Sequence, residues 1–408
     1  MIVVLTNAAF FDGTSDELRS GHVVIEDGYI VDIADSLPSS DDRRRTISVQ
    51  GRTLMPGLID AHVHAYFPDV DATVGDRLPV TMVAHWAARM LGASLNRGFT
   101  TVRDTGGADW GLCGAIERGW VTGPRLIYCG KALSQTGGHG DMRDPHDTGW
   151  CGCSGYVGHS SRVVDGPDGV RIAIREELRR GASFIKIMGS GGVASPADPL
   201  ERCQFSDEEI SAAVDETRRH GSYVTAHVHP DEAIRRCIEL GVPCLEHGTL
   251  ISDATAALAA ERDVSVVPTM AVIKALARHG RELGFPSVSL EKLAMIEPLA
   301  LQSLECLHRA RVRTGFGTDL IGELERYQCT EFAIRGEVWA AADVLRSATA
   351  INAEILGIDD RVGQIAPGFD ADLIAVSGNP LDDLNLFTDD GRNVPLVIKR
   401  GHIVKNEL

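Results

Sequence analysis

The feature that most constrains the fold is a regular alternation of short apolar segments with helical segments through the middle of the chain. Eight apolar segments have the residue types of buried strands, and longer stretches with helical patterns separate them. They are Leu54–His64, Thr100–Asp104, Arg125–Cys129, Phe184–Met188, Tyr223–Val228, Cys244–His247, Ser265–Thr269 and Thr314–Asp319. Eight parallel strands with intervening helices are the requirement of a closed barrel. The pattern therefore predicts an α/β protein built on a (β/α)8 TIM barrel.

The two ends of the chain have a different pattern, typical of antiparallel strands. Asp27-Gly28 separates two alternating apolar runs, and Arg400-Gly401 does the same near the other end. Such dipeptides are typical of tight hairpins. Neither end has enough strands to cover its own apolar face. We therefore expect residues 1–56 and 367–408 to form one small β-sandwich, and residues 57–366 to form the barrel.

Local signals support the helices and set one connection apart. Ser206 and Glu209 have the spacing of a capping box, and His220-Gly221 is a typical helix end. The connection from Ser134 to Gly169 instead contains many glycines and little apolar periodicity. A long structureless connection in a compact domain is usually functional, so we expect this loop to serve the site.

Charge and size exclude several classes of function. The chain has 408 residues and a formal net charge of −17, and its longest basic run is Arg43–Arg45. This balance repels nucleic acid and anionic membranes, so we expect neither as a partner. Met1–Leu5 is apolar, but it lacks the basic region of a signal peptide and Asn7 and Asp12 interrupt the apolar run, which predicts a cytoplasmic protein. Trp110 and Trp120 lie on predicted surface elements and could support a homo-oligomer.

A His-x-His sequence closes the first predicted barrel strand. Because side chains alternate along a strand, His62 and His64 should point to the same face. Two neighbouring imidazoles form half of a site for a divalent metal. Taken alone, the pair could equally be two hydrogen-bonded core histidines.

Lys186 lies in the middle of the apolar strand Phe184–Met188. A buried ammonium is costly unless it is paired or chemically altered. Nearby cations could depress its pKa, so that the free amine takes up carbon dioxide and becomes a carbamate that bridges two metals. The alternative is an ordinary ion pair with a barrel carboxylate.

His227, His247 and Asp319 each lie near the end of a predicted strand. The carboxyl ends of barrel strands meet on one face, where barrel enzymes keep their catalytic groups. Each residue alone could be structural. Together with the earlier residues they supply four histidines, one lysine and one aspartate, which predicts two divalent metal ions.

The motifs that carry these residues resemble those of the amidohydrolase superfamily. The resemblance rests on Met55-Pro-Gly-Leu-Ile-Asp-Ala-His-Val-His64, on Lys186, His227 and His247, and on Thr318-Asp319. It extends over nearly the whole chain. Four further segments are similar to the metal-dependent prolidase branch and to imidazolonepropionase-like enzymes: Gly98–Asp104, Ser134–His139, Lys186–Ser195 and Gly315–Asp319.

The resemblance implies a role for each residue. His62, His64 and Asp319 would bind the more buried metal, and His227 and His247 would bind the other. Carbamylated Lys186 would bridge the two ions, for which zinc is the usual metal. Asp319 and His139 would be catalytic, with His139 polarising the substrate carbonyl. As an alternative, His139 or His146 would only hold the long loop by hydrogen bonds.

One position departs from the branch. Prolidase-like members commonly have Tyr two residues after the strand-five histidine, where it helps to hold the substrate carboxylate, whereas this chain has His229. The departure bears on the preference for dipeptides. His229, Arg143 and Tyr327 are weaker candidates for substrate contact, because each follows a predicted barrel strand.

We therefore expect a binuclear metal-dependent hydrolase in which a metal-bridging hydroxide attacks an amide bond to a C-terminal amino acid. The substrate would be an Xaa-Pro dipeptide or an N-acyl amino acid. One alternative is the hydrolysis of a xenobiotic amide, carbamate or phenylurea. A cyclic-amide hydrolase or deaminase would also suit the metals, and an alternative of another class is a non-catalytic metal-binding scaffold.

Overall fold

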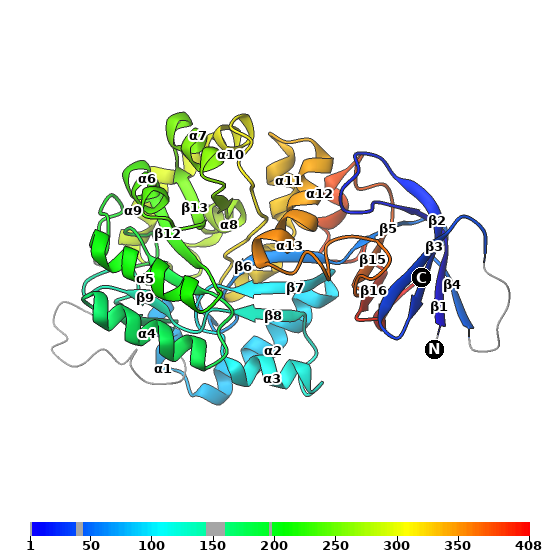
Figure 1. Cartoon of the computed structure of the whole chain (residues 1–408), viewed down its shortest axis with the longest axis horizontal. Helices are drawn as coiled ribbons and strands as arrows, with labels where there is room; N and C mark the ends of the chain where they lie inside the picture. The colour runs from blue at the N-terminus through cyan, green and yellow to red at the C-terminus, as the bar shows by residue number, and fades with distance from the viewer. Residues whose placement is uncertain (1, 38–43, 144–159, 196–197) are drawn as a thin grey trace.

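The computed structural model describes residues 2–37, 44–143, 160–195 and 198–408. A body in which helices surround central strands occupies one end of the molecule, and a β-sheet that contains both chain termini occupies the other (Figure 1). The candidate site belongs to the helical body.

The sheet at the chain termini has eight strands in the order β17-β16-β15-β5-β1-β2-β3, with β4 paired to β1. These strands are β1 (Ile2–Phe10), β2 (Arg19–Glu26), β3 (Tyr29–Ala34), β4 (Arg44–Ser48), β5 (Thr53–Pro56), β15 (Leu373–Val376), β16 (Leu396–Lys399) and β17 (His402–Asn406). Strands from the two ends of the chain thus pair directly, through β5 and β15. They form one continuous sheet, and its closure into a two-layer sandwich stays a prediction.

Both predicted hairpins are confirmed. β2 pairs antiparallel with β3 across Asp27-Gly28, whose φ angles are 50° and 91°. β16 pairs with β17 across Arg400-Gly401, whose φ angles are 48° and 74°. Left-handed conformations at both central residues match the right-handed twist of paired strands, which explains the choice of glycine at the second position.

The central strands form two parallel sheets. One has the order β6-β7-β8 and the other β10-β9-β11-β12-β13-β14. Their strands are β6 (Leu58–Val63), β7 (Phe99–Asp104), β8 (Arg125–Tyr128), β9 (Ala132–Ser134), β10 (Ser161–Val163), β11 (Ile185–Met188), β12 (Val224–Pro230), β13 (Cys244–Leu250) and β14 (Ser265–Val267). Seven of the eight predicted barrel segments overlap one of these strands.

The eighth predicted strand, Thr314–Asp319, is wrong as a regular strand. The segment makes only an isolated parallel bridge, between Thr314 and Val266. Two glycines and the left-handed φ of 55° at Asp319 interrupt a regular ladder. Its backbone nevertheless lies between two strands, because Gly315 N–H donates to Val266 O at 2.8 Å and Ala61 N–H donates to Phe316 O at 2.8 Å.

The first predicted strand, Leu54–His64, is also corrected, because it divides at Gly57 into β5 and β6. Gly57 N–H donates to Asp372 O in the terminal sheet, whereas Leu58 N–H donates to Gly98 O in the central sheet. A Cβ at Gly57 would lie 2.1 Å from Thr100 Oγ1. The chain therefore passes from one sheet to the other at a residue that has room for no side chain.

Helices follow most central strands and cover them. They are α1 (Ala72–Arg77), α2 (Val80–Asn96), α3 (Trp110–Glu117), α4 (Pro167–Arg179), α5 (Asp207–Arg219), α6 (Asp231–Glu239), α7 (Asp253–Glu261), α8 (Met270–His279), α9 (Ser287–Ile296), α10 (Ala300–Arg309), α11 (Thr330–Gly336), α12 (Ala341–Ser347) and α13 (Ala350–Leu356). The predicted capping box is present at the start of α5, and Gly221 follows its C-cap with a φ of 70°. Apolar residues of α4, α5 and α6 pack with those of β11 to β13 in one core cluster.

The connection predicted to be structureless from Ser134 to Gly169 contains ordered segments. β10 pairs in parallel with β9, and α4 begins at Pro167. Residues 144–159, which include His146, lie outside the described part of the chain.

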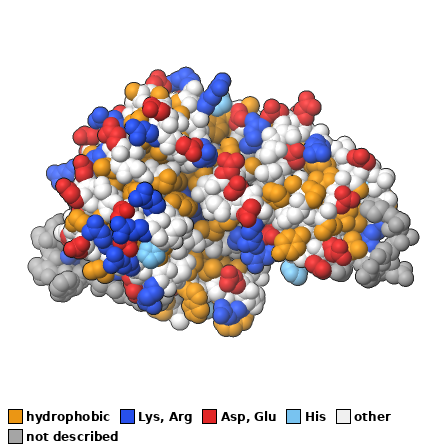
Figure 2. Space-filling model, viewed as in Figure 1, with side chains coloured by type: hydrophobic (Ala, Val, Ile, Leu, Met, Phe, Trp, Pro, Cys, Tyr) orange, Lys and Arg blue, Asp and Glu red, His pale blue; other side chains and the backbone are white. Residues whose placement is uncertain are grey.

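Charged side chains of both signs lie on the surface of the molecule. Lys and Arg side chains intermix with Asp and Glu on the face in Figure 2. Among the described residues, no helix is both long and apolar enough to cross a bilayer. Trp110 and Trp120 are exposed on this chain, and a homo-oligomer stays a prediction.

Candidate metal centre and active site

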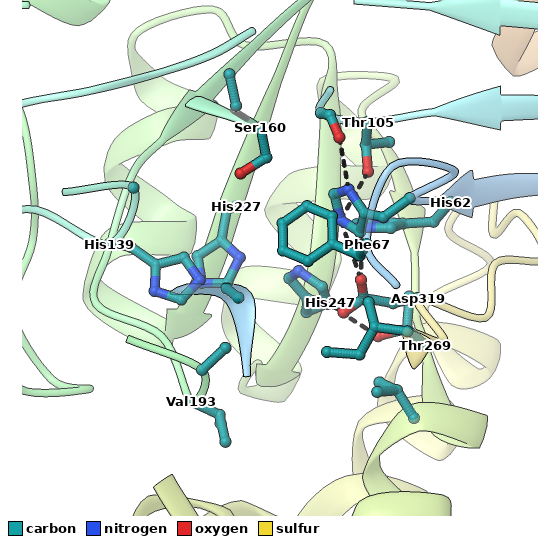
Figure 3. Close-up of a pocket in the computed structure, with 18 of the residues that line it drawn as sticks. His62, Phe67, Thr105, His139, Ser160, Val193, His227, His247, Thr269 and Asp319 are labelled. Carbon is teal, nitrogen blue, oxygen red and sulfur yellow. Dashed lines mark hydrogen bonds and ion pairs between the residues drawn. The ribbon is translucent and has the colours of Figure 1, made fainter. Parts of the chain in front are cut away.

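The side chains predicted as metal ligands all line one pocket that opens to solvent. They come from β6 and the residue after it, from β11, β12 and β13, and from the segment after Thr314. The six residues are His62, His64, Lys186, His227, His247 and Asp319. His139 and His229 line the same pocket. Figure 3 shows His139 beside His227 on one side, and His62 near Asp319 on the other.

His62, His64 and Asp319 form a first group of ligand atoms, all within 4.8 Å of one another. Asp319 Oδ1 lies 3.3 Å from His62 Nε2 and 3.2 Å from His64 Nε2. Two imidazole nitrogens and a carboxylate oxygen are donors that zinc accepts. The His-x-His pair therefore gains the third ligand that a metal site needs.

Hydrogen bonds on the far side of each ring fix this orientation. His62 Nδ1 donates to Glu246 Oε2 at 2.7 Å, and His64 Nδ1 donates to Gly106 O at 3.0 Å. Because each Nδ1 is occupied by its outer partner, each Nε2 is the nitrogen that could bind a metal beside Asp319. Outer partners of this kind hold the tautomer of metal-binding histidines.

Asp319 is held in place by its own backbone. Its φ is 55°, and its N–H donates to His62 O at 2.8 Å. The preceding residue is fixed as well, because Thr318 Oγ1 donates to buried Asp60 at 2.7 Å. Burial alone would raise the pKa of Asp319, but its contacts with His62 and His64 hold that pKa well below the usual range. The group is therefore an anion before any metal binds.

Lys186 lies on β11, which pairs with β12, the strand that carries His227. Its side chain is buried, with 2% of its surface exposed, and among the described residues it forms no hydrogen bond and no ion pair. Burial lowers the pKa of the amine. Among the described residues, Lys186 therefore does not form the alternative ion pair with a barrel carboxylate. A neutral amine is the form that reacts with carbon dioxide, so this setting suits a carbamate.

His227, His229 and His247 form a second group, also within 4.8 Å of one another and all buried. Burial lowers the pKa of each imidazole, that of His229 to about 3, which keeps these rings neutral. His227 Nε2 is buried without a hydrogen-bond partner among the described residues. An unpartnered buried nitrogen is costly, and a divalent ion would satisfy it. The donor set therefore fits a second metal.

His139 packs directly against the second group. Its ring stacks on that of His227, with centroids 4.2 Å apart and an interplanar angle of 23°. His139 Nδ1 lies 2.7 Å from Ser195 Oγ, and Ser195 Oγ donates in turn to Asp198. These two hydrogen bonds hold the ring at Nδ1, so that Nε2 is the nitrogen available to a group in the pocket. His146, the alternative loop histidine, lies outside the described residues.

A lysine fixes the loop that carries these hydrogen-bond partners. Lys292 of α9 donates from Nζ to the carbonyl oxygens of Gly192, Ser195 and Asp198, at 2.9, 2.7 and 2.5 Å. The Gly192 backbone lies against the His139 ring, since a Cβ there would come within 2.2 Å of Cε1. The ring is therefore confined between His227 and Gly192.

The upper walls of the pocket are apolar and come mainly from α8, α9 and the segment between them. They include Phe67, Val193, Val272, Ile273, Leu276, Phe285, Leu293, Ile296 and Ile321. Of the three weaker substrate candidates, only His229 lines the pocket. Arg143 instead binds Asp141, at 2.7 Å from Nε, and Tyr327 stacks on His279, with centroids 4.9 Å apart.

The sequence interpretation missed the residues behind the ligands. Glu246 and Arg103 form a fully buried ion pair of 2.6 Å under His62. Their signal in the sequence is a charged residue within each of two apolar strand segments, where a lone charge is costly. Ser195 and Asp198 had no comparable signal, because they lie on an irregular loop.

Comparison with known proteins agrees with this site. The family model described as "Amidohydrolase family" matches residues 53–404. The chain is 31% identical to ochratoxinase of Aspergillus niger, over 99% of this chain and 87% of that protein. A crystal structure of a prolidase complexed with N-methylphosphonate-L-proline is 45% identical, with a TM-score of 0.97 over 100% of both chains.

A Xaa-Pro dipeptidase with bound methionine in its active site is 31% identical, with a TM-score of 0.89 over 100% of both chains. The family model covers most of the chain, and each of these relatives aligns along nearly all of it. The protein therefore belongs to the amidohydrolase family, within its prolidase-like branch, and is a hydrolase of amide C–N bonds.

Proposed function

We propose that the chain hydrolyses the amide bond to a C-terminal amino acid, in an Xaa-Pro dipeptide or an N-acyl amino acid, with two divalent metal ions in its pocket. The observation that carries the proposal is the pair of ligand groups that share one pocket floor with buried Lys186. In this proposal the two central sheets and residues 314–319 form the (β/α)8 barrel (57–366), and residues 1–56 and 367–408 form the sandwich.

The residues would hold the metals as follows. His62, His64 and Asp319 would bind one ion, and His227 and His247 would bind the other. Lys186, carbamylated by carbon dioxide, would lie between them. Zinc suits these nitrogen and oxygen donors. When bound, such ions polarise a carbonyl group and acidify water near neutral pH.

The chain's own groups would manage the protons. Asp319 would accept a proton from the attacking water and deliver it to the leaving nitrogen as the C–N bond breaks. His139, whose Nδ1–H donates to Ser195 Oγ, would donate from Nε2 to the carbonyl oxygen when its ring is protonated, with Asp198 as the nearby counter-charge. The products are a carboxylic acid and a free amine.

The apolar walls support a substrate that carries a large hydrophobic group. They also favour a second candidate, a xenobiotic amide, carbamate or phenylurea, because none of the described residues that line the pocket is an arginine that could pair with a substrate carboxylate. Substrates of the first candidate carry a negatively charged carboxylate, which the second candidate does not require.

A substrate panel tests the proposal. The zinc-loaded protein and a chelated control are assayed on Xaa-Pro dipeptides, N-acyl amino acids and aryl carbamates. We expect turnover only with metal, and higher kcat/KM for substrates with a free carboxylate than for their amides. Equal rates on carboxylate and amide forms would favour the second candidate. No turnover by the fully loaded protein would overturn both.

Two variants test the residue roles. Asp319→Asn should lower kcat about 100-fold or more, the range for a lost proton-transfer group. Lys186→Ala should lose the bridging anion and regain part of its activity with added acetate or propionate. His279→Ala, which alters a histidine outside the pocket lining, is the matched control. Full activity of Asp319→Asn, or of Lys186→Ala without added acid, would contradict the assigned role.

A further inference from the structure

Three histidines from two adjacent strands converge where two would suffice for the second metal. His227 and His229 lie two residues apart on β12, so their side chains share one face. His247 lies on the neighbouring strand β13. The His229 and His247 rings stack with centroids 5.0 Å apart, and the His227 ring meets them edge-on at 4.8 and 4.5 Å.

Hydrogen bonds identify the nitrogen that each outer ring presents. His229 Nδ1 lies 3.1 Å from Thr249 Oγ1, and His247 Nδ1 lies 2.8 Å from Thr269 Oγ1. The two contacts are equivalent, because each pairs a strand histidine with a threonine near the end of the next strand. Metal-binding histidines typically have one nitrogen held by an outer partner while the other faces the ion. His229 therefore has the same outer support as His247.

The surroundings of His229 suit a metal ligand better than a residue that contacts a charged group of the substrate. The side chain is buried, with 4% of the residue exposed. His229 N–H donates to Ser190 Oγ at 3.1 Å, which fixes the backbone that carries the ring. One ligand atom of His229 lies within 4.8 Å of ligand atoms of both His227 and His247, and His227 Nε2 has no partner among the described residues. One ion could engage all three rings after small movements.

We propose that His229 is a third imidazole ligand of the metal held by His227 and His247, rather than a contact for the substrate. The inference rests on the proposed function, because it assumes that this second ion binds. Three imidazoles are a known ligand set for catalytic zinc, and the carbamylated Lys186 of the proposed function would take the fourth position. The substitution of His for the Tyr common in the branch would thus change the metal site, not only the specificity.

Metal binding provides the test. His229→Phe keeps a ring for stacking but has no ligand atom, and His229→Tyr restores the residue common in the branch. Both variants and the wild type are titrated with Zn²⁺ against a chromophoric chelator and with Co²⁺ by visible absorption. We expect two ions in the wild type, and in both variants an affinity for the second ion that is lower by at least about tenfold. The Co²⁺ spectrum of that site should change as well.

Controls separate the outcomes. His85→Ala removes an exposed imidazole on α2 and should leave both affinities unchanged. Thermal melting of the metal-free proteins checks that the variants fold. Two ions bound with unchanged affinity and spectrum in both His229 variants would overturn the inference, even if their turnover falls. Failure of the wild type to bind a second ion would overturn the proposed function as well.

Discussion

The buried carboxylate beneath the metal site allows the sharpest prediction from this structure. Glu246 is fully buried and accepts hydrogen bonds from His62 Nδ1 at 2.7 Å, from Arg103 Nη2 at 2.6 Å and from the Thr225 hydroxyl. Burial alone would raise its pKa, but Arg103 and His62 hold that pKa well below the ordinary value. We predict that Glu246→Gln, which preserves shape and removes the charge, destabilises the fold and weakens metal binding.

The magnitude follows from the partners. Arg103 is also fully buried, and its remaining hydrogen bonds, to Ala61 O at 2.6 Å, Tyr223 OH at 3.2 Å and Cys244 Sγ at 3.6 Å, are to neutral groups. Removing one member of a buried ion pair costs about 3 to 5 kcal/mol. The amide cannot satisfy both neighbours: an NH2 group toward Arg103 opposes a cation, and an NH2 group toward His62 forces the proton onto Nε2. The second case removes the lone pair that a metal needs, and loss of an outer partner lowers metal affinity about 10- to 100-fold.

The assay is urea unfolding of the metal-free protein, followed by Zn²⁺ titration against a chelator. Glu297→Gln is the matched control, because Glu297 pairs with Lys274 at 2.6 Å with both side chains about one-third exposed. That variant should lose no more than about 1 kcal/mol. If Glu246→Gln loses no more free energy of unfolding than Glu297→Gln, the buried pair does not stabilise the fold as argued.

Two further predictions test other parts of the structure. Gly192→Ala places a Cβ within 2.2 Å of the His139 ring, so kcat should fall about 100-fold with metal content retained. Gly169→Ala, where a Cβ meets nothing within 4 Å, is the control, and equal kcat in the two variants would refute the confinement of His139. Burial raises the pKa of Asp12, but hydrogen bonds from Ser15 and Thr14 outweigh it and lower that pKa to about 2. Asp12 therefore stabilises the fold above the unfolded pKa of about 4, and this contribution is lost as pH falls toward 2. Asp12→Asn should be less stable than wild type by about 1 kcal/mol at pH 7, with a difference that shrinks below pH 4; a difference independent of pH would contradict this.

The sequence predicted the positions of the central strands well, because apolar runs bounded by turn residues depend on local chemistry. It failed where two sheets meet. Leu54–His64 is one continuous apolar run, yet Gly57 bonds to the terminal sheet and Leu58 to the central one. Hydrophobicity is the same on both sides of that residue, so only the long-range partners, Asp372 and Gly98, determine the break.

The ligand residues could be predicted from the sequence for a related reason. A spacing of two places His62 and His64 on one face regardless of the rest of the fold. The groups that orient them lie far along the chain: Glu246 is 184 residues from His62. Lys292, which fixes the loop behind His139, comes from a helix about a hundred residues after that loop. Such partners follow from the topology, which no local pattern specifies.

Backbone geometry supplies the last part of the site. His247 and Asp319 have φ angles of 69° and 55°, although neither is a glycine and both lie in the pocket rather than in a hairpin. Such conformations cost about 1 to 3 kcal/mol each and persist only where the surroundings enforce them. Here the hydrogen bonds of Asp319 N–H to His62 O and of His247 Nδ1 to Thr269 fix both residues. The sequence therefore indicates which atoms can bind a metal, whereas the direction in which they point depends on strained backbone that the packed strands maintain.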